Sequence, residues 1–382
     1  MRVLVWQWGR FGGGPRFATL LAEGLAAVPG VTATLSLAAA AEILRGGSPP
    51  RCDLPVATYH GMPGFVLRAA AAPFAVRGLA RRIAAMRPDI AVCALAGPLD
   101  LLMAAALRRL GIPFIVLVHD ADAHPGDGFP LQMWLQRRLC GRAMTVAALS
   151  THVGKQLLRQ KLAGTWGRPL IHLTHPPMPY EVPPRPAGAA GSFRLLSFGR
   201  LLPYKGLDLL ADGLRRLEPQ PGLVVRVVGS GPESPALAVL RALPGVTVEN
   251  RWVPEGEVGA LLSWADAVVL PYREASQSGV AAAALAARRY VIATNVGGLA
   301  EQLANEPLAI LCEPRADSLA NGLRRVLHSP PDMDDAAPVS PRAAWRDLGL
   351  LLVEQLRPLL RSGKAEEPRD RSDSRAAVGW AE

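Results

Sequence analysis

The chain has 382 residues, half of them hydrophobic, and a formal net charge of +10. This composition favours a folded α/β protein of two or three domains and excludes collagen-like and disordered chains. The positive charge indicates an anionic partner, such as nucleotide phosphates, nucleic acid or an anionic membrane surface. No aromatic residues alternate with a basic stripe, so we expect no nucleic-acid partner.

Two features bear on cellular location. The longest uncharged stretch lies between Glu23 and Glu42, and Pro29-Gly30 within it predicts a turn rather than a membrane-spanning helix. Residues 1–8 have neither the long apolar core nor the cleavage site of a signal peptide. The four cysteines are too scattered for a zinc site or a disulfide framework. We therefore expect a cytoplasmic protein.

Short apolar runs alternate with amphipathic helical patterns through the first part of the chain. This alternation is typical of βαβ units, which form a parallel sheet covered by helices on both faces. It predicts an N-terminal Rossmann-like domain over residues 1–175. The expected strands are 3–8, 32–37, 90–94, 114–118 and 145–148.

A proline-rich segment then interrupts the pattern. Residues 176–192 contain too many prolines for a helix or a central strand, so we interpret them as a linker. The βα alternation restarts and predicts a second Rossmann-like domain over 193–342. Its expected strands are 195–198, 224–228, 247–248, 267–270, 290–293 and 309–311.

The end of the chain has two parts. An amphipathic pattern over 343–360 predicts a final helix that packs back towards the N-terminal domain. The charged, weakly hydrophobic residues 361–382 predict a disordered tail.

A candidate anion site follows the first strand of the second domain. Arg200 and Lys205 lie in a turn between that strand and a helix. A turn at the carboxyl end of a parallel strand faces the ligand crevice, and the next helix offers free N–H groups. The alternative is an ordinary surface turn with solvated cations.

A second loop, 271–280, opens another helix in the same way. The backbone amides of Ser278, Gly279 and Val280 could bind phosphate. The alternative is that Ser276 or Ser278 only caps the helix. Glu274 does not help an anion site. Its carboxylate would accept hydrogen bonds from the hydroxyls of an attached sugar.

Four segments in this order resemble glycosyltransferase family 4. They are Gly199-Arg200-x4-Lys205-Gly206, Val227–Glu233, the segment around Glu274, and Val291–Gly298. The resemblance implies a GT-B fold, with two Rossmann-like parallel-sheet domains facing a central cleft. It also implies sugar transfer from a UDP- or GDP-linked donor with retention of configuration, without a cofactor or an obligatory metal.

The resemblance also assigns roles to residues. Arg200 and Lys205 would hold the diphosphate, and Glu274 would contact the donor sugar. Many members carry a second glutamate eight positions after the first, which binds ribose, but Ala282 stands here and Ala283 follows. The loop is similar to that of a variant branch, and the ribose contact stays open.

The first domain contributes candidates for the other side of the cleft. His119 and Asp120 follow a strand, and His124 lies in the next loop. The resemblance places His119 near the reacting sugar, and we assign Asp120 and His124 to the acceptor side. The letter pattern Asp120-Ala121-Asp122 lies on the side where this family carries no metal, so we predict no metal site.

A glycine loop, Gly12-Gly13-Gly14, follows the first strand. By resemblance, Gly13 and Gly14 approach the donor phosphate, and we assign nearby Arg16 to the acceptor side. A dinucleotide dehydrogenase would need an acidic residue after the second strand, and residues 32–41 contain none, which argues against that activity.

Two further segments complete the predictions. Asn250 and Arg251 follow a strand on the donor side and are assigned to the nucleobase. Residues 62–87 carry arginines among apolar residues, which fits either a peripheral membrane element or ordinary surface helices.

The expected activity is a retaining glycosyltransferase acting on a glycan or lipid-linked acceptor in cell-surface polysaccharide or glycoconjugate synthesis. A sugar-nucleotide epimerase of the same fold and a non-catalytic nucleotide-binding subunit are the alternatives.

Overall fold

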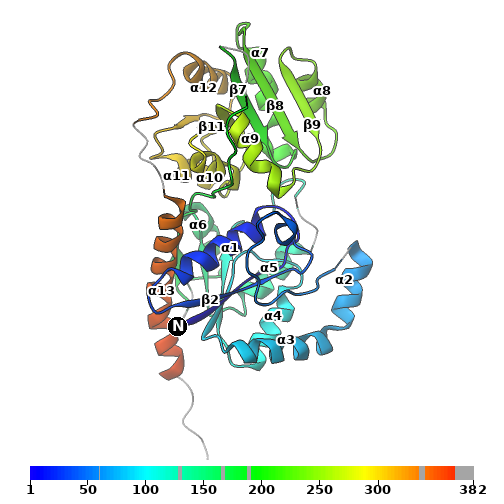
Figure 1. Ribbon diagram of the computed structural model, residues 1–382, viewed down its shortest axis with the longest axis vertical. Coiled ribbons are helices and arrows are strands. Elements are labelled where there is room, and N and C mark those ends of the chain that lie inside the picture. Colours follow the sequence, from blue (N-terminus) through cyan, green and yellow to red (C-terminus); the bar gives the residue numbers. More distant parts are fainter. Residues whose placement is uncertain (60, 128–130, 165–167, 187–190, 335–339, 366–382) are drawn as a thin grey trace, which may run out of the picture.

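The computed structural model describes residues 1–59, 61–127, 131–164, 168–186, 191–334 and 340–365. They form two lobes stacked along the long axis of the molecule (Figure 1). Each lobe contains a six-stranded sheet with helices on both faces, and every strand pair is parallel. The expected fold class is confirmed.

The N-terminal lobe has the strand order β2-β1-β3-β4-β5-β6. Its four inner strands are mainly apolar and buried on both faces, as parallel strands between helix layers must be. The strands are β1 (Arg2–Gln7), β2 (Thr32–Leu37), β3 (Ile90–Cys93), β4 (Phe114–Val118), β5 (Thr145–Ala148) and β6 (Leu170–His172). The helices are α1 (Gly13–Ala26), η1 (Glu42–Arg45), α2 (Gly61–Ala70), α3 (Ala72–Met86), α4 (Asp100–Arg109), α5 (Gln132–Cys140) and α6 (Thr151–Arg159).

The C-terminal lobe has the order β12-β11-β10-β7-β8-β9. Its strands are β7 (Phe193–Phe198), β8 (Leu223–Gly229), β9 (Val246–Asn250), β10 (Ala267–Leu270), β11 (Tyr290–Thr294) and β12 (Ala309–Cys312). Its helices are η2 (Pro203–Lys205), α7 (Leu207–Arg215), α8 (Pro235–Arg241), η3 (Glu255–Glu257), α9 (Val258–Trp264), α10 (Gly279–Ala286), α11 (Gly297–Leu303) and α12 (Ala316–His328).

The order of the second sheet positions the candidate site. Strands β7 and β10 are neighbours, and the chain continues from them towards opposite edges of the sheet. Loops that follow two such strands leave a crevice between them, where ligands bind in open α/β sheets. These loops contain the Arg200–Lys205 turn and the Glu274–Gly279 segment.

The sequence predicted every strand except β6. Residues 32–37, 114–118, 145–148 and 267–270 have the expected bounds. The last three are nearly continuous apolar runs, and residues 32–37 alternate polar with apolar side chains. Strand β6 was missed because it has only three residues, at the edge of the sheet. Such a short segment carries no measurable periodicity.

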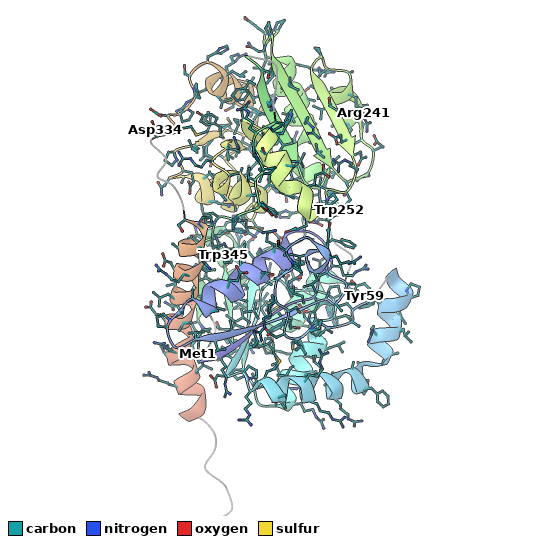
Figure 2. All side chains as sticks on the ribbon, viewed as in Figure 1. Met1, Tyr59, Arg241, Trp252, Asp334 and Trp345 are labelled. Atoms are coloured by element: carbon teal, nitrogen blue, oxygen red, sulfur yellow. The ribbon has the colours of Figure 1, made fainter. Side chains whose placement is uncertain are left out.

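A long C-terminal helix, α13 (Pro341–Ala365), lies along the N-terminal lobe and packs on α1 (Figure 1). Trp345 on this helix lies beside α1 (Figure 2), and its Nε1 donates a hydrogen bond to Pro177 O at 2.8 Å. The helix continues to Ala365, five residues into the segment 361–382 that was expected to be disordered. Extending a formed helix costs little per residue. Residues 366–382 lie outside the described part.

The expected linker is extended and packed between the lobes where the structure describes it. Residues 173–186 have no regular secondary structure. Met178 is buried, and its amide donates to Ala282 O at 3.1 Å, so the segment is fastened to α10. Residues 187–190 lie outside the described residues.

Candidate active site

A cavity of about 550 Å³ lies between the two lobes. This volume suits a small-molecule ligand. The N-terminal lobe supplies Gly12–Gly14, His119 and Asp120 to its wall, and the C-terminal lobe supplies Arg200, Lys205 and the start of α10. The structure therefore brings most of the predicted residues to one place.

Gly206 and the loop after β10 fix the position of the Arg200–Lys205 turn. Gly206 has a φ of 64°, and a Cβ added there would overlap Pro271 O, so only glycine fits. The Arg273 amide donates to Tyr204 O at 2.8 Å. The turn and the loop after β10 thus form one unit.

Arg200 and Lys205 both line the cavity but differ in their surroundings. Arg200 forms an ion pair with Asp127 of the other lobe and donates to the Tyr204 hydroxyl at 3.2 Å. Lys205 Nζ lies 3.7 Å from the centre of the Tyr272 ring. Burial, together with the nearby Arg200 charge, lowers the pKa of Lys205 to about 8. An anion bound here would restore the stability of the charged lysine.

The start of α10 also faces the cavity. Ser278 caps the helix, since its Oγ accepts a hydrogen bond from the Ala281 amide at 3.2 Å. The Ser278 amide is already engaged, because it donates to Gln302 Oε1 at 2.8 Å. Phosphate binding would therefore depend on the amides of Gly279 and Val280, which have no partner within the helix.

Glu274 follows β10 and lies next to His124, a residue of the cavity wall. Its side chain is half exposed and is not among the described residues that line the cavity. Its neighbour Ala275 does line the cavity, and so does Ala283, eight positions later. The two cavity-lining positions with this eight-residue spacing, 275 and 283, are therefore both alanine.

His124 connects Glu274 to the N-terminal lobe. Its Nε2 lies 3.1 Å from Asp120 Oδ1 and its Nδ1 lies 3.4 Å from Glu274 Oε2. The hydrogen bond with Asp120 raises the pKa of His124, with Glu274 adding to the effect. The ring stacks on Tyr204 at 4.6 Å. His124 and Asp120 thus lie beside the Arg200–Lys205 turn.

His119 lies half-buried in the cavity wall at the end of β4. Burial lowers its pKa, so the ring is neutral. Its Nε2 lies 3.0 Å from Ala94 O. A carbonyl oxygen only accepts hydrogen bonds, so Nε2 carries the proton and Nδ1 is an acceptor. This tautomer can receive a hydrogen bond from a hydroxyl group of a ligand.

His175 also lines the cavity, although no motif in the sequence indicated it. Its ring centre lies 6.2 Å from that of His119, and burial lowers its pKa to about 4. The residue follows β6, the one strand that was not predicted. Had β6 been recognised, the position of His175 after a strand end would have been the signal.

Gly13, Gly14 and Arg16 all lie in the first turn of α1 but have different surroundings. Gly13 and Gly14 line the cavity, as their assignment requires. Arg16 forms an ion pair with Glu255 of the C-terminal lobe and donates to Pro179 O at 2.8 Å. Its guanidinium lies over the Tyr180 ring at 4.2 Å. These contacts join the two lobes and do not place Arg16 with His119 and Asp120.

The two residues assigned to the nucleobase do not line the cavity. Asn250 bonds Gly231 and Glu233, while Arg251 pairs with Glu249 and Glu257. Both side chains form hydrogen bonds with carboxylates of nearby glutamates and are not among the residues that line the cavity. The next residues, Trp252 and Val253, line the cavity. Trp252 lies where the C-terminal lobe faces the other lobe (Figure 2), with its ring centre 5.6 Å from that of Phe11.

Two family profiles match the chain, one on each lobe. "Glycosyltransferase Family 4" matches residues 11–166 and "Glycosyl transferases group 1" matches residues 192–329. The chain belongs to the glycosyltransferase family 4 type. The resemblance drawn from the motifs is thereby confirmed.

Curated relatives match shorter segments of this family 4 chain. A GDP-mannose:glycolipid 4-beta-D-mannosyltransferase of Xanthomonas campestris pv. campestris is 34% identical over 112 residues, which are 26% of this chain and 30% of that protein. A glycogen synthase of Mycobacterium tuberculosis is 34% identical over 145 residues, 37% and 35% of the two chains. These matches span only about a third of the relatives' length.

Solved structures match nearly the whole chain at low identity and show the shared GT-B fold. Sucrose-phosphate synthase from Thermosynechococcus elongatus has a TM-score of 0.65 at 16% identity, covering 94% of this chain and 99% of its own. Anabaena Alr3699/HepE in complex with UDP and glucose has a TM-score of 0.62 at 17% identity, covering 95% and 100%.

Proposed function

We propose that this family 4 chain transfers a sugar from a UDP- or GDP-linked donor to a glycan or lipid-linked acceptor, with retention of configuration. Its setting would be the synthesis of cell-surface polysaccharide or glycoconjugate. The observation that carries the proposal is the pair Arg200 and Lys205, which faces the start of α10 across one cavity between the lobes.

The cations would act on the leaving group. Breaking the bond between the sugar and the diphosphate develops negative charge on the phosphate oxygens. Arg200, Lys205 and the first amides of α10 are placed to stabilise that charge as it forms. We propose that these groups do so without a cofactor or an obligatory metal.

The acceptor side would be the N-terminal lobe. His119 lines the cavity, and its Nδ1 would accept a hydrogen bond from a hydroxyl of the sugar or of the acceptor. Hydrogen bonds between the lobes would keep water out during transfer, among them Ser150 Oγ to Ser276 O at 3.0 Å. The protein would thereby favour transfer over hydrolysis of the donor.

The test measures nucleoside diphosphate release and product formation from a panel of donors, with lipid and glycan acceptors, in buffer containing EDTA. Arg200→Ala or Lys205→Ala should reduce transfer by about two to three orders of magnitude while the protein remains folded. Arg273→Ala is the matched control, because Arg273 pairs with Asp208 and does not line the cavity.

Other outcomes identify the alternatives. Full activity in either cavity variant would contradict the role of that cation. An epimerised donor formed without acceptor would favour the epimerase, and donor binding without turnover would favour the non-catalytic subunit. Retention predicts that the new linkage keeps the anomeric configuration of the donor, which NMR of the product measures.

We also propose that the N-terminal lobe meets an anionic membrane surface through α2 and α3. Leu67 and Phe74 are 71% and 75% exposed, and arginines accompany them on the same two helices. Exposed apolar side chains beside cations suit the interface of an anionic bilayer. In the described part of the chain, no helix is long and apolar enough to span a bilayer.

A further inference from the structure

The cavity extends from the Arg200–Lys205 turn to the carboxyl ends of β8 and β9. Gly229, Ser230, Trp252 and Val253 line it just beyond the carboxyl ends of β8 and β9. Arg200 and Lys205 line it beyond β7, the next strand of the sheet. If the diphosphate binds at the cations, the base reaches towards β8 and β9, and the ribose lies between them.

Helix α10 offers no hydrogen-bond acceptor from a side chain to that ribose. The residues of α10 that line the cavity, Gly279, Val280 and Ala283, have no polar side-chain atoms. Ala282 faces away from it, in the apolar cluster of the N-terminal lobe. The hydroxyls of a ribose, each a hydrogen-bond donor, would meet only methyl groups on this helix.

Glu255 supplies a carboxylate next to the same place. It lies in η3, and its side chain lines the cavity while only 13% of its surface is exposed. Val258, three residues later, packs in one apolar cluster with Ala283. Among the described residues that line the cavity, the acidic ones are Asp120 and Glu255. Asp120 bonds to His124 beside the Arg200–Lys205 turn.

The contacts of Glu255 leave one oxygen for a ligand. Arg16 bonds its Oε1, and the Glu255 amide donates to Glu42 Oε1 at 3.0 Å, which holds the start of η3. Oε2 receives no hydrogen bond from any described residue. A carboxylate held on one side by a guanidinium is well suited to accept hydrogen bonds on the other.

We propose that Glu255 binds the ribose of the donor, with Oε2 accepting hydrogen bonds from the 2′- and 3′-hydroxyls. This inference rests on the proposed function, since it requires a nucleoside diphosphate in the cavity. It assigns the ribose contact to the loop after β9 instead of α10, and to the element that also carries the lobe-bridging ion pair with Arg16.

The test is calorimetric titration of UDP and GDP against their 2′-deoxy and 3′-deoxy forms. The wild-type protein should bind the better ribonucleotide about tenfold or more tightly than its deoxy forms, as expected for a hydrogen bond to a charged group. In Glu255→Gln, an amide N–H₂ replaces the accepting oxygen, so the preference should fall to near unity. Glu257→Gln, the matched control, should keep it, because Glu257 pairs with Arg251 outside the cavity.

A second variant separates ligand binding from structure. Arg16→Met removes the ion pair but keeps the carboxylate, so nucleotide affinity can fall while the preference for ribose should remain. The inference is overturned if Glu255→Gln keeps the wild-type preference, or if Arg16→Met loses it to the same extent. If the wild-type protein binds neither ribonucleotide, the proposed function itself is overturned, and this inference with it.

Discussion

Lys205 lies where burial favours the neutral form of its side chain. Its ammonium lies against the Tyr272 ring, and its pKa is lowered to about 8. A buried lysine without a counter-ion is costly, and a diphosphate would supply the missing negative charge. Arg200 differs because Asp127 already pairs with it. The two cations would therefore respond differently to pH.

We predict that nucleoside diphosphate affinity falls as pH rises through 8. Above that pH the free protein loses the Lys205 charge, while bound diphosphate keeps the lysine protonated, so binding must take up a proton. Between pH 8 and 9 the dissociation constant should rise by up to about tenfold. Calorimetry from pH 7.5 to 9.5 measures it. Lys205→Arg should flatten the profile, and a flat wild-type profile would contradict the prediction.

The turn after β7 and the loop after β10 act as one element. Gly206 allows the turn to lie directly against Pro271, and the bond between the Arg273 amide and Tyr204 O joins the two backbones. The position of Lys205 therefore depends on close backbone approach at Gly206. Gly111 offers a comparison, because it has nearly the same φ, 65° against 64°, but open space around it.

Replacing each of these glycines by alanine separates conformational strain from overlap. Gly111→Ala should lower the free energy of unfolding by about 1 kcal/mol, the cost of a left-handed alanine. Gly206→Ala adds the collision with Pro271 O and should cost about 1–3 kcal/mol more, with weaker nucleotide binding. Urea unfolding and calorimetry measure both effects. Equal losses in the two variants would show that close packing at Gly206 is unimportant.

The two lobes are joined at several points around the cavity. The carboxylate of Glu301 accepts hydrogen bonds from the amides of Thr151 and His152 at 2.7 and 2.8 Å, so α11 of one lobe caps α6 of the other. On the outside of the N-terminal lobe, α2 and α3 lie at the edge away from α13 (Figure 1). The cavity and the proposed membrane surface thus belong to separate parts of the molecule.

We predict that the protein sediments with anionic vesicles and that Leu67→Glu with Phe74→Glu abolishes this binding. Each glutamate removes an exposed apolar contact and adds repulsion from the anionic lipid. Leu350→Glu on α13 is the control, since Leu350 is also exposed, at 43%. Binding should weaken with salt. Equal sedimentation of the double variant and wild type would refute the membrane surface.

Much of the fold and part of the site could be predicted from the sequence. The apolar runs encode the strands locally, so both sheets were predicted, apart from the three-residue β6. The Arg200–Lys205 turn was predictable because residues that follow a parallel strand face the crevice. Gly13, Gly14 and His119 follow strands in the same way, and the structure places all of them at the cavity.

Only the tertiary structure decided which neighbouring side chains face inward. Ala275 lines the cavity whereas Glu274 does not, and Trp252 lines it whereas Arg251 does not. Such one-residue differences depend on contacts with residues far along the chain. For example, the side chain of Glu274 contacts His124, which is 150 residues away in the sequence. Local periodicity in the sequence predicts where strands and helices lie. The direction of a loop side chain is instead set by packing and ion pairs that form when distant segments meet.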